Sequence, residues 1–199
     1  ISGPHLNRIG MVDKCQAALS AAGIGSAAFT ETEGNPSTET VEKAVDAYKS
    51  SGADFIVAFG GGSPLDVAKA AGILAAYGGK ITEYEGGGKV PGPVVPMIAI
   101  PTTAGTGSEV TSFSVITDHS RNYKLSVSSN YLLPAYAILD PELIASVPAG
   151  TAAACGVDAM VHALEAYLSL AASPFSDMFA LQARHLIGKN LRAYAANRG

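Results

Sequence analysis

The sequence predicts an α/β domain with a parallel sheet and crossover helices, followed by the start of an all-α domain. Two observations support this fold class. Short and almost continuously apolar runs at 53–60 and 96–103 alternate with helical patterns, as is typical of strands covered on both faces. After Pro148 only helical periodicity remains. We therefore expect an α/β domain over 1–148 and an all-α domain over 149–199.

The first elements follow from local patterns. Ala and Leu at helical spacing predict a helix over 14–23, and 26–32 is a candidate strand. Residues 38–52 carry apolar side chains at i, i+3, i+4 and i+7, which predicts an amphipathic helix that ends at Gly52. A loop and a further helix are expected over 61–79. Beyond Pro148, two helices should be separated by a turn at Ser173–Pro174.

The composition excludes several classes of protein. The 199 residues carry 13 Lys and Arg against 17 Asp and Glu, and a net charge of −4 argues against nucleic-acid binding. Charged residues make up only 15% and hydrophobic residues 48%, which excludes a disordered chain. No apolar run approaches the roughly 18 residues of a membrane helix. Two isolated cysteines, Cys15 and Cys155, argue against a disulfide framework and favour a cytoplasmic location.

A glycine-rich turn follows the first buried strand. Gly60, Gly61 and Gly62 have no Cβ, so a ligand can approach the backbone where the next helix begins. The N–H groups and dipole of that helix attract phosphate, so the pattern predicts a pyrophosphate cradle. A plain glycine-rich turn is the alternative, since the pattern is neither GxGxxG nor a Walker A loop.

The helix after this turn is predicted to start with a cap. Ser63 would be the N-cap, and Pro64 would take the first helical position, where its missing N–H is not needed. Asp66 has the capping-box spacing from Ser63. Because a carboxylate repels phosphate, we expect Asp66 to accept a hydrogen bond from a nicotinamide amide or a ribose.

A second polar loop follows the second buried strand. Ligands of open α/β sheets bind outside the carboxyl ends of the strands, so two loops after neighbouring strands would face one crevice. A solvated turn is the alternative for this loop. Its hydroxyl groups come from five residues: Thr102, Thr103, Thr106, Ser108 and Thr111.

The helical region contains a pair of potential metal ligands. Asp158 and His162 are four residues apart, so they share one face of a helix within reach of one cation. A carboxylate and an imidazole suit Fe²⁺ or Zn²⁺. A helix-surface ion pair is the alternative, because a metal site needs three or four ligands. Glu165, one turn further, is a candidate partner for the second imidazole nitrogen.

The three motifs together resemble the iron-containing (group III) alcohol dehydrogenases. The resemblance is carried by GGGSPLD, IPTTAGTGSEVT and GVDAMVHALEAY, and it extends to NPST, SGAD and DPEL. It implies a dehydroquinate synthase-like fold in which the active site lies between a dinucleotide-binding domain and a helical metal-binding domain. The opening strand is expected to precede this chain and further helices to follow it. The implied activity is NAD(P)-dependent oxidation of small alcohols or reduction of aldehydes, by a homodimer or larger homo-oligomer.

The resemblance also implies roles for individual residues. Asp158 and His162 would be the first two of four metal ligands, with Fe²⁺ as the expected metal and Zn²⁺ as an alternative. The pyrophosphate, nicotinamide, adenine and ribose would be contacted by residues from four segments: Asn35, Gly61, Gly62, Ser63, Asp66, Thr102, Thr103, Thr106, Thr111 and Lys124.

Two departures from the family pattern refine the expected specificity. Members that prefer NAD often carry an aspartate where Gly3 stands, and glycine does not repel a 2′-phosphate. NADP is therefore expected to be accepted and slightly favoured. Phe113 replaces a family asparagine, which predicts an apolar pocket for simple primary alcohols. Two alternatives stay open: a truncated, non-catalytic nucleotide-binding fragment, and a polyol oxidoreductase similar to glycerol dehydrogenase.

Overall fold

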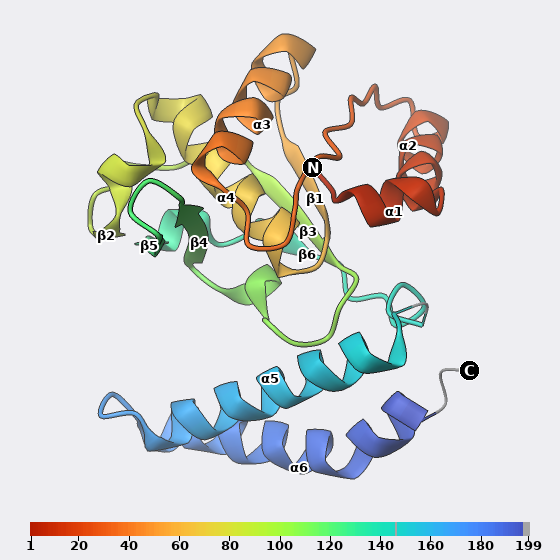
Figure 1. Ribbon diagram of the computed structural model, residues 1–199, viewed down its shortest axis with the longest axis vertical. Helices are drawn as coiled ribbons and strands as arrows, with labels where there is room; N and C mark the ends of the chain where they lie inside the picture. Colours follow the sequence, from red (N-terminus) through yellow and green to blue (C-terminus); the bar gives the residue numbers. More distant parts are fainter. Residues whose placement is uncertain (146, 197–199) are drawn as a thin grey trace. The chain divides into compact units, whose positions relative to one another are not determined.

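The computed structural model describes residues 1–145 and 147–196 (Figure 1). Contacts divide the chain into two compact units. The first unit comprises 1–101 and 108–139, and the second comprises 102–107 with the described part of 140–199. This division lies earlier in the chain than the boundary near Pro148, and the assignment of 1–148 and 149–199 to two folding domains stays a prediction.

A three-stranded parallel sheet lies in the first unit. Its order is β1 (Ile56–Gly60), β3 (Met97–Pro101) and β6 (Tyr136–Ala137). Ile56 is opposite Met97 and Gly60 is opposite Pro101, so β1 and β3 end at the same edge of the sheet. Both predicted apolar strands and the parallel arrangement are confirmed.

Four helices accompany this sheet. They are α1 (Pro4–Arg8), α2 (Met11–Ala21), α3 (Thr38–Ser51) and α4 (Gly62–Tyr77). The α3 helix begins as its sequence predicts, because the Ser37 hydroxyl accepts a hydrogen bond from the Thr40 N–H. It ends at Gly52, whose left-handed φ of 65° suits glycine.

The α4 helix contributes to both hydrophobic clusters of the first unit. On one side, Leu65 and Ala68 pack with the strand residues Ala58 and Ala99. On the other side, α4 residues pack with α3 and a second sheet. That second cluster includes, from these elements, Val41, Val45, Val67, Ala70, Ile73, Ile116 and Leu125.

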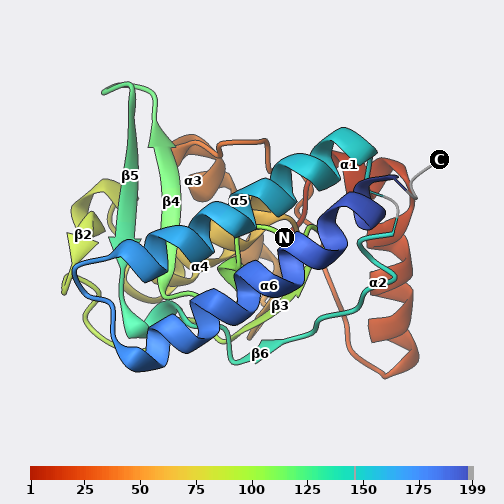
Figure 2. The ribbon, with the colours of Figure 1, turned by 90° about the horizontal axis from the view of Figure 1, so that it is seen from below.

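The second sheet was not predicted. An antiparallel hairpin joins β4 (Phe113–Asp118) to β5 (Tyr123–Ser128), and the short β2 (Gly86–Gly87) pairs parallel to β5 (Figure 2). Three short 3-10 helices complete the unit: η1 (Ile81–Tyr84), η2 (Ser108–Val110) and η3 (Asn130–Leu132).

The predicted strand at 26–32 is wrong. Residues 24–33 have no regular secondary structure. Two backbone hydrogen bonds join this segment to a single residue, Ser2, whose N–H donates to Phe29 O and whose carbonyl accepts from the Thr32 N–H. One residue cannot form a ladder, so the extended segment does not become a strand.

The second unit contains a pair of long helices. The predicted turn at Ser173–Pro174 separates α5 (Ala149–Leu168) from α6 (Pro174–Ala196), and the two helices lie side by side (Figure 2). Neither these nor the other described helices are long and apolar enough to span a membrane. The pair exposes many large apolar side chains, among them Val157, Val161, Leu164, Leu168, Phe175, Met178 and Phe179.

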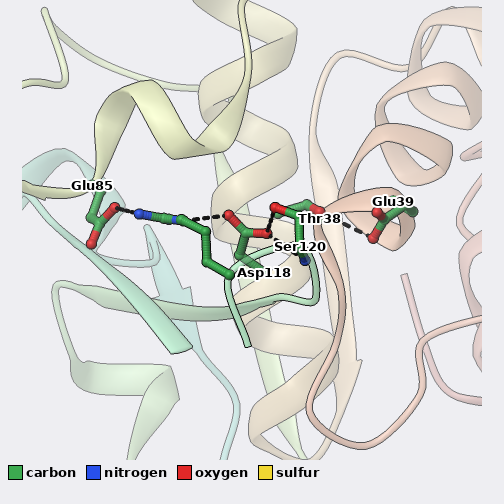
Figure 3. A network of polar contacts seen from close by, with 6 residues as sticks. Thr38, Glu39, Glu85, Asp118 and Ser120 are labelled. Carbon is green, nitrogen blue, oxygen red and sulfur yellow. Dashed lines mark hydrogen bonds and ion pairs between the residues drawn. The ribbon is translucent and has the colours of Figure 1, made fainter. Parts of the chain in front are cut away.

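A polar network holds the turn of the β4–β5 hairpin (Figure 3). Asp118 accepts hydrogen bonds from the Ser120 N–H and hydroxyl, and its other oxygen lies 2.6 Å from Arg121 Nε. Arg121 also reaches Glu85 at 2.9 Å. These hydrogen bonds from Ser120 and Arg121 lower the pKa of Asp118 to about 2.

We predict that Asp118→Asn destabilises the protein in a pH-dependent way. A carboxylate with a lowered pKa stabilises the folded state above its ordinary pKa of 3.8, and this stabilisation is lost as the pH falls through about 2. Urea unfolding should therefore show a smaller difference between wild type and variant at about pH 3 than at about pH 6. The exposed Asp46, changed to Asn, is the control. An equal difference at both pH values would contradict the prediction.

Candidate functional site

The glycine-rich turn lies directly between β1 and α4. Gly60 has a φ of 153°, and a Cβ on this residue would lie 2.7 Å from Pro64 Cγ. Gly61 is extended and is the N-cap of α4, and no side chain caps the helix there. The cap residue therefore places no side chain over the first N–H groups of α4. A pyrophosphate cradle requires that these N–H groups be accessible.

The predicted cap of α4 is wrong in detail. The helix already begins at Gly62, so Ser63 and Pro64 lie inside its first turn and Ser63 is not the N-cap. The reason is that Gly61 takes the extended cap conformation itself, while Pro64 still occupies a position whose N–H would have no helical partner. Asp66 does not form a capping box, because its carboxylate turns to another element.

Asp66 binds the second polar loop. The Ser108 hydroxyl donates to Asp66 Oδ1 at 2.8 Å, and the Ser114 hydroxyl donates to the Asp66 carbonyl at 2.8 Å. Burial raises the pKa of the Asp66 carboxyl, and the hydrogen bond from Ser108 opposes this effect. The structure thus joins the helix after the glycine-rich turn to η2 and β4.

Lys69, one turn after Asp66 on α4, also joins this helix to η2 and β4. Its side chain is only 2% exposed. Its ammonium group contacts the 108–113 segment through five oxygen atoms: Ser108 O at 2.6 Å, Phe113 O at 2.8 Å, Thr111 O at 2.9 Å, Ser108 Oγ at 3.0 Å and Thr111 Oγ1 at 3.1 Å. Burial lowers the pKa of Lys69 to about 8, against the opposing fields of Asp66 and Glu109.

Sequence analysis missed Lys69. A signal was available, because Lys69 is the only charged residue of α4 after Asp66, in a run of small and apolar residues. A lone lysine in a helix that is apolar on all sides has no exposed face to occupy, so it must be buried with partners.

Two other predicted cofactor residues contact each other. Lys124 Nζ lies 2.7 Å from Asn35 Oδ1, although 89 positions separate them in the sequence. Asn35 has a left-handed φ of 55°, a conformation that asparagine tolerates better than most residues. Their contact places both on one side of the first unit.

The predicted threonines divide between the two units. Thr111 lies in the first unit beside Lys69, whereas Thr102, Thr103 and Thr106 belong to the second. Their segment packs on α5, since a Cβ on Gly105 would lie 2.9 Å from the Cys155 carbonyl. The common crevice of the two loops stays a prediction, although Gly60 and Pro101, where the loops begin, are paired neighbours.

Phe113 contributes its backbone to the site. Its carbonyl accepts from Lys69, while its ring is half exposed. A separate cavity of about 620 Å³ lies between α2, α3 and β1, and its walls include Cys15, Phe29 and Tyr48. None of the predicted cofactor residues lines that cavity, so we do not assign the cofactor to it.

The predicted metal ligands are neighbours on α5. His162 Nε2 lies 3.5 Å from Asp158 Oδ2, and His162 Nδ1 lies 3.9 Å from Glu165 Oε2. This fits a cation held by Nε2 and the Asp158 carboxylate, with Glu165 beside the remaining nitrogen. Among residues 1–145 and 147–196 no group of three metal-binding side chains is assembled, so the assignment of Asp158 and His162 to a metal stays a prediction.

Two family profiles match the chain in succession. The profile described as iron-containing alcohol dehydrogenase matches residues 1–141, and that of the C-terminal domain of the Fe-containing alcohol dehydrogenase family matches 152–198. The chain belongs to the iron-containing alcohol dehydrogenase family.

Similar proteins support this family assignment. The NAD-dependent methanol dehydrogenase of Bacillus methanolicus is 43% identical over 197 residues, which are 99% of this chain and 52% of that protein. A crystal structure of 1,3-propanediol oxidoreductase is 40% identical with a TM-score of 0.95, over 98% of this chain and 51% of that one. The structure of sulfoacetaldehyde reductase from Bifidobacterium kashiwanohense in complex with NAD⁺ is 33% identical with a TM-score of 0.90. The match covers 99% of this chain and 52% of that one. The chain thus spans about half the length of these relatives.

We predict that Gly60→Ala destabilises the glycine-rich turn. Its φ and the nearness of Pro64 leave no room for a Cβ, so the change should lower the free energy of unfolding by about 1–3 kcal/mol. Gly25→Ala is the matched control, because a Cβ there meets no atom within 4 Å. Urea denaturation measures both. Equal stability of the two variants would contradict the steric argument.

Proposed function

We propose that this chain supplies the dinucleotide-binding domain and the first metal-binding helix of an NAD(P)-dependent, metal-dependent alcohol dehydrogenase. The substrates are small primary alcohols and the corresponding aldehydes. The observation that carries the proposal is that both family profiles match one chain in order. The glycine-rich turn and the Asp158–His162 pair therefore occur together, one in each matched region.

The residues of the first unit would bind and orient the dinucleotide. The glycines leave the N–H groups at the start of α4 accessible to the pyrophosphate, where the helix dipole favours negative charge. The half-buried Asp66 would accept a hydrogen bond from the nicotinamide end, and Thr111 would contact the ribose side. Lys124 and Asn35, already paired, would meet the cofactor together. The names of two relatives, an NAD-dependent dehydrogenase and a reductase solved with NAD⁺, support this assignment.

The remaining cofactor contacts extend this proposal. Gly61, Gly62 and Ser63 would hold the pyrophosphate from the α4 side. Thr102, Thr103 and Thr106, on the second-unit segment, would line the adenine and ribose side. These contacts rest on the family resemblance.

The second unit would bind part of the metal. Asp158 would balance the charge of a divalent ion, and His162 would be a neutral imidazole ligand oriented by Glu165. When bound, the metal lowers the pKa of the alcohol hydroxyl and the dinucleotide accepts the hydride. Fe²⁺ is proposed on the family name, and Zn²⁺ suits the same two donor types. The two further ligands would come from residues beyond this chain.

Specificity would depend on two residues. Phe113 presents a half-exposed ring at the start of β4, which favours an apolar substrate over a polyol. Gly3 carries no carboxylate to repel a 2′-phosphate, so NADP would be accepted and slightly favoured. On the family resemblance, we extend the proposal to a homodimer or larger homo-oligomer in the cytoplasm.

The apolar surface of α5 and α6 supports the proposed domain organisation. Large side chains such as Leu164, Phe175 and Phe179 are exposed on a helix pair. An exposed apolar surface of this kind marks a contact site. We propose that the rest of the helical metal-binding domain, present in the longer relatives, covers it.

Metal and activity measurements on the protein at its natural length test the function. Asp158→Ala and His162→Ala should each lower bound metal and alcohol-dependent NAD(P)H formation by more than about tenfold, because even indirect changes at metal sites have effects of this size. The exposed Glu142, changed to Gln, is the control. A wild-type protein that binds the dinucleotide but has neither metal nor activity would support the non-catalytic alternative. Faster turnover of glycerol than of primary alcohols would support the polyol alternative.

Cofactor preference is tested by steady-state kinetics. We predict that wild type uses NADP at least as well as NAD, and that Gly3→Asp shifts the ratio of kcat/KM values toward NAD by about tenfold, because the new carboxylate repels the 2′-phosphate. The variant requires Thr32 to move slightly, since a Cβ on Gly3 would lie 3.1 Å from its carbonyl. A wild-type preference for NAD of about tenfold or more contradicts the prediction.

A further inference from the structure

Lys69 is a buried cation for which the proposed chemistry has no direct use. It lies on α4, one turn beyond Asp66, and its ammonium group points to the 108–113 segment rather than to the glycine-rich turn. A buried ammonium group is unfavourable unless hydrogen bonds replace its water, so this position demands a reason.

We propose that Lys69 is a positioning residue for the dinucleotide. By holding the 108–113 segment against α4, it sets the positions of the Asp66 carboxylate and the Thr111 hydroxyl. The inference rests on the proposed function, which assigns both of these groups to the cofactor.

The direction of the hydrogen bonds supports a relay from Lys69 to Asp66. An ammonium group only donates, so Ser108 Oγ must accept from Lys69 through a lone pair. The single hydroxyl hydrogen of Ser108 is then available for Asp66 Oδ1, 2.8 Å away. Lys69 thus orients Ser108, and Ser108 orients the carboxylate.

Three of the five oxygens that contact Lys69 belong to the main chain. The carbonyls of Ser108, Thr111 and Phe113 converge on one nitrogen atom within 2.9 Å. Because ammonium has three hydrogens, the two hydroxyl contacts share them. These hydrogen bonds fix the backbone at three positions between 108 and 113. A hydrogen bond to a single side chain would not fix the backbone of the segment.

Charge strengthens this arrangement near neutral pH. The pKa of Lys69 is about 8, so most molecules carry the ammonium form at pH 7. The fields of Asp66 and Glu109, on α4 and η2, favour that form. Bonds with an ionised donor are stronger than neutral ones.

The experiment compares Lys69→Met and Lys69→Arg in the protein at its natural length. The readouts are the dissociation constants of NAD⁺ and NADP⁺ at a temperature where each variant is folded, and the free energy of unfolding. Lys69→Met should weaken dinucleotide binding by about tenfold or more, since the segment loses its charged donor. Lys69→Arg should recover part of the affinity. Lys49→Met, on the exposed side of α3, is the control and should bind as wild type does.

The outcomes separate positioning from a purely structural role. If folded Lys69→Met binds both dinucleotides as tightly as wild type, Lys69 only stabilises the fold and the inference is wrong. If wild type itself binds neither dinucleotide, the proposed function fails instead.

Hydrogen exchange of the wild-type protein provides a test that needs no variant. If Lys69 holds the segment, the amides of 108–113 should open only together with those of α4, at the same free energy. Local opening of 108–113 while α4 stays protected would overturn the inference. Local opening would overturn the inference even where both Lys69 variants fail to fold, whereas joint opening supports only the step in which Lys69 holds the segment, and the dissociation constants then decide the role in dinucleotide binding.

Discussion

The burial of α4 is the constraint on which the first unit depends. All residues from Pro64 to Leu74 except Asp66 are buried, and apolar residues among them contribute to both hydrophobic clusters. Small residues such as Ala68, Ala70 and Ala71 allow elements to approach the helix from several sides. A charged side chain in this region cannot reach water, so the surrounding chain must supply its hydrogen-bond partners. The course of 108–113 around Lys69 meets this requirement.

Elements with a strong local pattern could be predicted from the sequence. The α3 helix has an apolar stripe, a serine cap and a glycine end, and each of these acts within a few residues. The strands β1 and β3 are nearly continuous apolar runs, and their buried residues pack with α4. The order of these elements was enough to predict a parallel sheet, which the structure confirms.

The β4–β5 hairpin could not be predicted because its inward side chains are not all apolar. Ser114 and Asp118 of β4 are buried, and each has a hydrogen-bond partner. The Ser114 hydroxyl donates to the distant Asp66 carbonyl, and Asp118 accepts from the Ser120 hydroxyl in the hairpin turn. The alternation of apolar and polar residues is therefore lost. The cap of α4 was missed for a related reason, since a glycine can take the cap position without a side-chain signal.

Of the candidate site, sequence analysis identified most of the groups, but neither Lys69 nor the contacts between the groups. The contacts between Asp66 and Ser108 and between Asn35 and Lys124 join residues far apart in the chain. A third long-range contact, between Lys69 and Phe113, separates the role of a backbone from that of its side chain. Lys69 binds the carbonyl of Phe113 and leaves its ring half exposed. The side chain at position 113 can therefore change while its backbone keeps the hydrogen bond from Lys69, so the side chain proposed to set selectivity can evolve separately from the scaffold.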